Sequence, residues 1–278
     1  IFHRRETASM PTVRDIRSKA GEEPITMVTA YDAVTASLAE QSGVDIALVG
    51  DSMGNAVLGY DDTLPVTVDE VASRTGAVAR GAEDTLVVAD MPFLSFGTDL
   101  QTSIENCGRM VKEEGANAVK IESGEHTVEL TDRLTDLGIP VVAHVGLTPQ
   151  SVNQTGYTRQ GSDPEQAKKI ARLAREHEAA GAFACILEHI PANLATQITD
   201  DLAIPTIGIG AGGDCDGQVL VINDILGLSD RTPPFAKSFG NVREEMESAI
   251  GDYVDAVEDG EFPGEEHSHV AEELDDLY

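Results

Sequence analysis

The sequence predicts an α/β fold, a closed (β/α)₈ TIM barrel, and three observations support this prediction. Short β-rich runs alternate with helix-like stretches along almost the whole chain. The length of 278 residues suits one such barrel, which commonly takes roughly 250. Ionisable residues follow many of the expected strands rather than one or two. In a closed barrel the carboxyl ends of all strands surround one opening, whereas the outer strands of an open sheet would lie too far apart to share a site.

The expected strands are short, and helix-length segments separate them. In chain order the strands are 25–30, 46–50, 86–89, 118–121, 141–145, 185–187 and 206–209, with a less regular eighth within 218–222. The helices expected between and after them include 33–41, 68–80, 100–114, 126–137, 165–180, 193–202 and 244–258. Gly115, Gly138 and Gly181 each stand a few residues before a strand, where a short loop has to leave a helix.

The chain has no internal linker that would split it. We therefore expect an N-terminal extension over 1–11, a single barrel catalytic domain over 12–263, and an acidic C-terminal tail over 264–278. Residues 241–278 contain 14 acidic residues and one basic residue, Arg243. Such composition predicts that 264–278 are solvated or disordered.

The charge of the chain restricts its partners and its surroundings. The formal net charge is −30, which argues against nucleic acid and anionic membrane surfaces as partners. Lysine is rare, with 6 residues against 13 arginines, and a lysine-poor acidic surface favours a halophilic source. Three cysteines without a CxxC pair, no apolar run of 18 residues and no secretory leader predict a cytoplasmic protein.

Three acidic residues stand directly after apolar runs and form a candidate metal site. Asp51 follows IALVG, Asp90 follows LVVA and Glu122 follows AVKI. A hard cation such as Mg²⁺ binds oxygen ligands, commonly carboxylates together with water and substrate oxygens. Each residue alone is better explained as a turn or helix-capping residue. Three at one barrel opening favour a metal site.

A lysine shares its strand with one of these acids. Lys120 lies two residues before Glu122, so the two side chains point to the same face of the strand. A lysine between Val119 and Ile121 is costly to bury unless it meets an anion, and the carboxylate of a small 2-oxo acid is such an anion. The alternative is a structural ion pair between Lys120 and Glu122.

The fifth and sixth strands end in further polar residues. Glu188, at the end of the apolar run CIL, is a candidate general base. His189 beside it faces the other way and is more readily structural. His144 ends the fifth strand and is either a ligand of substrate or of a metal-bound water, or a satisfied core histidine.

A glycine-rich run, GIGAGG at 208–213, invites comparison with dinucleotide-binding loops. It follows the seventh expected strand rather than the first, so this interpretation fails. Barrel loops after strands seven and eight often bind anions through backbone N–H groups, which leaves a weak anion-site signal.

Taken together, several runs closely resemble the 3-methyl-2-oxobutanoate hydroxymethyltransferase (ketopantoate hydroxymethyltransferase) family. The resemblance covers roughly Thr12 to Pro263, in matching order and spacing. The runs are TAYDAVTASLAEQSGVDIALVGDSMGNAVLGYDDTLPVTVDE, ADMPFLSFG, GANAVKIESG, VVAHVGLTPQSVN, AGAFACILEHIP and IPTIGIGAGGDCDGQVLVINDILGL.

The resemblance implies a barrel of the phosphoenolpyruvate mutase/isocitrate lyase type and an established set of roles. It implies Mg²⁺ bound by Asp51, Asp90 and Glu122. It also implies 2-oxo acid contacts from Asp51, Ser52, Asp90 and Lys120, with Glu188 as proton acceptor.

The reaction implied is transfer of a hydroxymethyl group from 5,10-methylenetetrahydrofolate to 3-methyl-2-oxobutanoate. The product is 2-dehydropantoate, on the route to pantothenate and coenzyme A, and Mg²⁺ stabilises the enolate that forms. Members of this family are commonly homo-decamers. The resemblance leaves open whether a modified pterin replaces folate as the one-carbon carrier.

Two other functions are kept as alternatives. One is a C–C lyase or mutase of the same barrel superfamily acting on another 2-oxo acid, but the Cys-containing loop that those enzymes carry near strand five is missing from this sequence. The other is a non-catalytic, metabolite-binding barrel. It would be expected to have lost a metal ligand or the base, and all of them are present.

Overall fold

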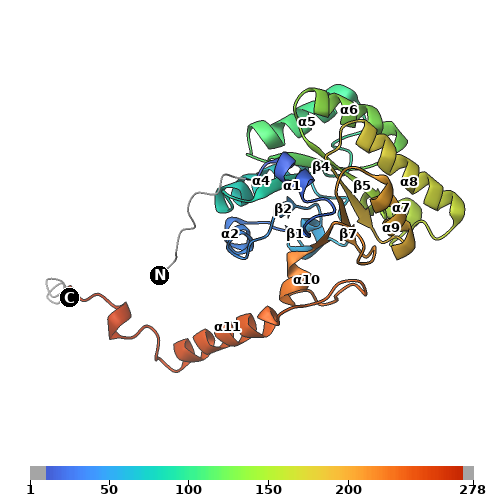
Figure 1. Cartoon of the computed structure of the whole chain (residues 1–278). Helices are drawn as coiled ribbons and strands as arrows, with labels where there is room; N and C mark the ends of the chain where they lie inside the picture. The colour runs from blue at the N-terminus through green and yellow to red at the C-terminus, as the bar shows by residue number, and fades with distance from the viewer. Residues whose placement is uncertain (1–10, 272–278) are drawn as a thin grey trace. The chain divides into compact units, whose positions relative to one another are not determined.

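The computed structural model describes residues 11–271, and its strands close into a parallel barrel (Figure 1). Each strand pairs with the next one along the chain, and β8 pairs with β1. The predicted barrel is confirmed, and all eight predicted strands overlap observed ones. The bounds are β1 Ile25–Thr29, β2 Ile46–Val49, β3 Leu86–Asp90, β4 Ala118–Glu122, β5 Val141–Gly146, β6 Ala184–Glu188, β7 Thr206–Ile209 and β8 Gly217–Leu220.

Strands β3, β4, β5 and β6 each run one residue further at the carboxyl end than predicted, and in β3, β4 and β6 that extra residue is acidic. Asp90 pairs in register with Lys120, Glu122 with His144, and Glu188 with Ile209. These residues therefore belong to the strands themselves and not to the loops that follow. Glu188 is paired with a strand on both sides, and Asp90 and Glu122 are each paired on one side. Such pairing fixes a backbone more firmly than a loop would.

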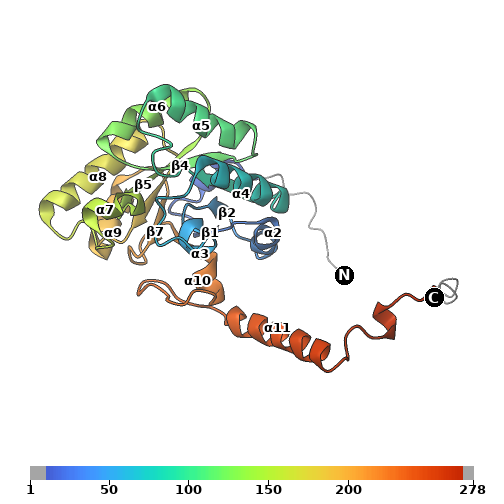
Figure 2. The ribbon, with the colours of Figure 1, turned by 180° about the vertical axis from the view of Figure 1, so that it is seen from behind.

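Helices surround the barrel, as the two views in Figures 1 and 2 show. Several begin at a side-chain cap: Asp32, Asp99 and Asp163 each accept hydrogen bonds from the first turn of the helix that follows. The longer helices are α2 Ala33–Gln41, α4 Val68–Gly81, α5 Leu100–Lys112, α6 Val128–Asp136, α8 Pro164–Ala179 and α9 Ala192–Asp201. The shorter ones are α1 Val13–Ser18, α3 Met53–Ala56, α7 Val152–Thr155 and α10 Ile222–Leu226, with 3₁₀ turns at η1 Glu125–Thr127, η2 Pro149–Ser151 and η3 Glu265–His267.

The two faces of the strands contribute to different parts of the core. Alternate residues of the strands, among them Ile46, Leu86, Val88 and Ile186, pack together inside the barrel. The residues between them pack outward against the helices in two further clusters. Since side chains alternate along a strand, the inward positions of β3, β4 and β6 continue to Asp90, Glu122 and Glu188.

The structure divides the chain into two compact units. One contains the residues up to Ile222 together with Pro234–Ala236, and the other contains Asn223–Pro233 and Lys237–Tyr278. We expected one domain over 12–263, whereas this division places helix α11 (Val242–Glu258) outside the barrel unit. The reason is that α11 buries none of its own residues. Residues 265–271 are exposed, whereas most of the expected N-terminal extension (1–10) and the rest of the expected tail (272–278) lie outside the described residues.

Among residues 11–271, no helix is both long and apolar enough to cross a membrane.

Candidate active site

A buried cluster of charged side chains occupies the carboxyl ends of strands β2 to β5. Asp51, Asp90, Lys120, Glu122 and His144 are all at least 93% buried. The last four occupy inward strand positions, and Asp51 lies in the turn one residue after Gly50. The barrel thus brings together residues that are separated by up to 93 positions in the sequence, as the distribution of polar residues at strand ends predicts.

Lys120 and Asp90 form a two-pronged ion pair at the centre of this cluster. Lys120 Nζ lies 2.7 Å from Asp90 Oδ1 and 2.8 Å from Asp90 Oδ2. The alternative structural pair between Lys120 and Glu122 is therefore wrong: the lysine pairs across to the neighbouring strand. Asp90 Oδ2 also accepts the backbone N–H of Asp51 at 3.3 Å, which ties the end of β3 to the turn after β2.

Gln150 joins the other two acids, and the sequence interpretation missed it. Its side-chain amide donates to Asp51 Oδ2 at 2.9 Å and to the carbonyl of Met91 at 2.9 Å. Its backbone N–H donates to Glu122 Oε1 at 3.1 Å. The only sequence signal is a polar residue in the run LTPQ directly after β5. None of the three acids caps a helix in the described chain. Asp90 and Glu122 end strands, so the alternative of simple turn or capping residues is wrong for these two, whereas Asp51 does lie in a turn.

Burial in this cluster shifts the protonation of every charged group. Burial and then the Asp90 charge raise the pKa of Asp51 to about 7. Burial likewise raises the pKa values of Asp90 and Glu122, although Lys120 opposes the shift in each acid. Burial alone would lower the pKa of Lys120, but Asp90, Asp51 and Glu122 raise it above its ordinary value. One lysine therefore faces three acids. Burial is the main cause of their raised pKa values, and the charges of the neighbouring acids add to it.

This donor set suits a divalent cation by its chemistry. Three buried carboxylates with one ammonium group carry an excess of negative charge, and hard oxygen ligands match Mg²⁺. As the side chains stand, however, no three His, Cys, Asp or Glu residues of 11–271 converge on one point that would hold a metal. These side chains do not converge because they bind other groups. Lys120 donates to both carboxylate oxygens of Asp90, and Gln150 donates to Asp51 and to Glu122.

Glu188 and His144 form the other side of the cluster. Oε2 of Glu188 lies 3.2 Å from Nε2 of His144, and the Glu188 side chain is 16% exposed. The alignment is poor, and neither ring nitrogen of His144 has a hydrogen-bond partner within the described chain. Burial and then Lys120 lower the pKa of His144, so the ring is neutral near pH 7. His144 is thus buried but unsatisfied, which argues against a satisfied core histidine.

Two residues with hydroxyl groups, and one residue with a left-handed backbone conformation, lie next in sequence to residues of the cluster or in contact with such a neighbour. Ser52 Oγ lies 2.9 Å from the hydroxyl of Tyr31, a buried residue that the sequence interpretation also missed. His189 has φ +48°, a conformation that few non-glycine residues adopt, and its ring lies 5.3 Å from that of Phe235. Within the described residues the buried Nδ1 of His189 has no hydrogen-bond partner, so the structural role of this residue stays a prediction.

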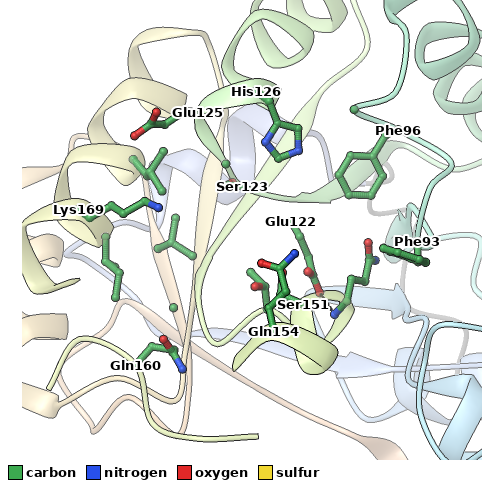
Figure 3. Close-up of a pocket in the computed structure, with 18 of the residues that line it drawn as sticks. Phe93, Phe96, Glu122, Ser123, Glu125, His126, Ser151, Gln154, Gln160 and Lys169 are labelled. Carbon is green, nitrogen blue, oxygen red and sulfur yellow. Dashed lines mark hydrogen bonds between the residues drawn. The ribbon is translucent and has the colours of Figure 1, made fainter. Parts of the chain in front are cut away.

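A pocket of about 780 Å³ opens beside Glu122 (Figure 3). Its walls come from the loop after β3, the turn after β4, the loop after β5 and helix α8. Phe93, Phe96, Glu125, His126 and Lys169 contribute its most distinctive side chains. No pattern in the sequence indicates this pocket, because its residues come from four separate segments and only Glu122 is an ionisable residue at a strand end.

The glycine-rich run at 208–213 has a packing explanation. A Cβ atom at Gly210 would lie 2.9 Å from the ring of Phe235, and one at Gly212 would lie 2.6 Å from the Cβ of Ala192. Both glycines also have positive φ angles, of +62° and +89°. Close approach and backbone conformation therefore require these glycines without any ligand.

Comparison with protein families gives a match over nearly the whole chain. Residues 10–265 match the family described as ketopantoate hydroxymethyltransferase. The chain belongs to this family. A relative from Haloarcula marismortui, named 3-methyl-2-oxobutanoate hydroxymethyltransferase, is 72% identical over 269 residues, which are 97% of this chain and 100% of the relative. A relative of the same name from Halobacterium salinarum is 64% identical over 275 residues, covering 97% and 100%.

Solved structures confirm the type of barrel that this ketopantoate hydroxymethyltransferase family member adopts. A phosphonopyruvate hydrolase superposes with a TM-score of 0.61 at 13% identity, covering 95% of this chain and 93% of the other. A 2,3-dimethylmalate lyase, described as a member of the PEP mutase/isocitrate lyase superfamily, gives 0.58 at 17% identity, covering 95% and 94%. At such identities these structures establish the fold alone.

Proposed function

We propose that the chain transfers a hydroxymethyl group from 5,10-methylenetetrahydrofolate to 3-methyl-2-oxobutanoate, giving 2-dehydropantoate on the route to pantothenate and coenzyme A. The observation that carries the proposal is the arrangement of the cluster. Three buried acids and one lysine lie at one side of the barrel opening, and Glu188 with His144 lies at the other. The names of the relatives supply the substrate.

Lys120 and Ser52 are suited to hold the 2-oxo acid. Lys120 carries a fixed positive charge in a buried setting, where an anion is held more strongly than in water. We propose that the substrate carboxylate and 2-oxo oxygen face this ammonium group, with Ser52 as a neighbouring donor. As charge develops on the 2-oxo oxygen, Lys120 stabilises it in place.

Asp51, Asp90 and Glu122 are the residues that would hold Mg²⁺. When bound, the ion would act as a Lewis acid that draws electrons from the 2-oxo group and makes the C3 proton more acidic. The pKa of about 7 for Asp51 means that a cation and a proton compete for this carboxyl.

Glu188 is the base in this proposal. Its side chain is 16% exposed, so a substrate in the barrel opening can reach its carboxylate. His144, with Nε2 3.2 Å from Oε2 of Glu188, is neutral and places no positive charge beside this base.

In the proposed reaction the C3–H bond breaks and the proton goes to Glu188. The electron pair moves into the C2–C3 bond, and the C2=O π pair moves onto the oxygen. The methylene carbon of the folate then loses its bonds to both N5 and N10, and it gains one bond to C3 and one to the oxygen of a water molecule. The C3 proton and one proton of the water end on the two nitrogens, so tetrahydrofolate leaves and the product carries a hydroxymethyl group. We further propose that the protein works in the cytoplasm as a homo-oligomer.

A direct assay tests the proposal. Purified protein in high salt with Mg²⁺, 3-methyl-2-oxobutanoate and 5,10-methylenetetrahydrofolate is expected to form 2-dehydropantoate, measured by mass spectrometry. Absence of product while the 2-oxo acid still binds would favour a non-catalytic barrel. Cleavage of the 2-oxo acid instead would favour a lyase.

A further inference from the structure

We infer that the pocket beside Glu122 binds the one-carbon carrier, with its pterin ring at Phe93 and Phe96 and its anionic tail at Lys169. This inference rests on the proposed function, because that function requires a second substrate next to the 2-oxo acid. The pocket offers a large space next to the buried cluster.

The size and position of the pocket suit a second substrate. A volume of about 780 Å³ lies within the range of roughly 300–1,000 Å³ that is usual for small-molecule sites. Glu122 and Gln150 line the pocket and also belong to the buried cluster, so the two spaces share a wall. A ligand in this pocket would therefore lie next to the atoms that the 2-oxo acid occupies.

One end of the pocket presents aromatic faces. Figure 3 shows Phe93 and Phe96 at the same side, with His126 above them. Phe96 is only 8% exposed and packs into the core, whereas Phe93 is 39% exposed and has an open face. A flat heteroaromatic ring stacks on such a face, and a pterin is a ring of this kind.

The middle of the pocket supplies hydrogen-bonding groups that suit the edge of a pterin. Gln154 and Ser151 lie beside Glu122, between the aromatic side and Lys169 in the view of Figure 3. Amide and hydroxyl side chains both donate and accept, and a pterin edge carries donors and acceptors side by side.

The opposite end carries a lysine. Lys169 on α8 lies at the far side of the pocket from Phe93 (Figure 3). Glu125, the nearby acid, is paired with Arg172, which is the main reason that the pKa of Glu125 is lowered, and Lys169 contributes to the same shift from a greater distance. Among residues 11–271, no carboxylate lies within 4.0 Å of the Lys169 ammonium group. Because Glu125 is engaged by Arg172, Lys169 can still attract an anionic ligand, in a protein whose net charge of −30 leaves few such groups.

The experiment compares a carrier that has the tail with one that lacks it. The probes are tetrahydrofolate and the tail-less 6-methyltetrahydropterin, titrated by calorimetry with Mg²⁺ and 3-methyl-2-oxobutanoate present. Lys169→Gln is expected to weaken tetrahydrofolate binding two- to fivefold, as for an exposed ion pair, and to leave 6-methyltetrahydropterin unchanged. Raising the salt concentration is expected to shrink this difference.

Phe93→Ala tests the aromatic end. It is expected to weaken binding of both probes about tenfold, because stacking does not depend on the tail. Phe93→Leu keeps an apolar side chain and is expected to lose less affinity for both probes than Phe93→Ala. A pterin whose tail ends in a phosphate in place of carboxylates serves as the third probe, and tighter binding than tetrahydrofolate would identify the modified pterin as the carrier in this pocket.

Lys168→Gln is the matched control, since Lys168 is the adjacent residue on α8, pairs with Glu165 and does not line the pocket. This substitution is expected to leave the affinity for both probes unchanged. Wild-type affinities in Lys169→Gln and Phe93→Ala would overturn the inference and place the carrier elsewhere. Exchange of the C3 proton of the 2-oxo acid, measured on wild type without any pterin, reports on the proposed function alone, so the two failures are distinguishable.

Discussion

The buried cluster at the strand ends and the pocket beside it share Glu122, yet they are built in different ways. In the cluster, charged groups are held by strand pairing and by each other, as Lys120 is by both oxygens of Asp90. In the pocket, Phe93 and Lys169 project from a loop and a helix surface, and both are exposed. Burial thus fixes the positions of the charged groups in the cluster, whereas the pocket leaves side-chain surface exposed to a ligand.

This difference has an energetic consequence. Removing one partner from a buried ion pair leaves an uncompensated charge, whereas removing an exposed side chain costs little. We therefore expect substitutions in the cluster to alter stability and substitutions in the pocket to alter binding. The predictions that follow test this contrast, beginning with the largest effect on stability.

Lys120→Met is expected to lower the free energy of unfolding by about 3–5 kcal/mol, because Asp90 keeps its burial and loses its cation. The measurement is urea unfolding with a chelator present. Lys168→Met, on the exposed face of α8, is the control and should stay within about 0.5 kcal/mol of wild type. Equal effects of the two substitutions would contradict the contrast.

Gln150→Leu is expected to cost about 1–3 kcal/mol, because Asp51 and the Met91 carbonyl each lose a buried hydrogen bond. The same unfolding experiment measures it. Gln154→Leu is the control, since Gln154 lines the pocket outside the cluster and should leave stability nearly unchanged. A wild-type stability for Gln150→Leu would mean that the amide does not hold Asp51.

His177 gives a pH dependence with a defined sign. It is buried against Thr131, whose hydroxyl lies 2.9 Å from Nδ1, and burial lowers the pKa of His177 from 6.5 to about 4. Below pH 6.5 the unfolded chain takes up a proton that the folded chain does not, so stability falls as the pH falls.

Between pH 7.5 and 5.5 this contribution is expected to remove about 1 kcal/mol, which keeps the experiment above the pI of about 4.3. His177→Gln should lose that part of the pH dependence, and His126→Gln, at the pocket wall, serves as the control. The same pH slope in wild type and His177→Gln would contradict the assignment.

Leu94→Gly gives the smallest expected effect, a stabilisation of up to about 1 kcal/mol. Leu94 has φ +59° in the loop after β3 and is 64% exposed, so glycine relieves strain and loses little contact. Thermal unfolding measures it, with Leu137→Gly as the control. Clear destabilisation by Leu94→Gly would mean that the leucine side chain holds the loop.

The strands and the strand-end residues could be predicted from the sequence because both follow a local pattern. Alternation and apolar runs fix the strands, and Asp90, Lys120 and Glu122 follow from the parity of their positions. The pairing of Lys120 with Asp90 in place of Glu122 depends on the register between β3 and β4, which the sequence does not reveal.

Gln150 and the pocket could not be predicted for a related reason. Gln150 lies in a 3₁₀ turn, and its three hydrogen bonds reach residues 28, 59 and 99 positions away. Phe93 and Lys169 line one pocket only because the loop after β3 and helix α8 border the same opening. Long-range contacts of this kind leave no periodic trace in a single sequence.

The central claim is that Glu188 removes the C3 proton of the 2-oxo acid. The most direct measurement is exchange of that proton for deuterium in 3-methyl-2-oxobutanoate, followed by ¹H NMR in D₂O with Mg²⁺ and no pterin. Wild type is expected to exchange it, and Glu188→Gln to be slower by about 10²–10⁴-fold with unchanged binding of the 2-oxo acid. Exchange by Glu188→Gln at the wild-type rate would contradict the claim.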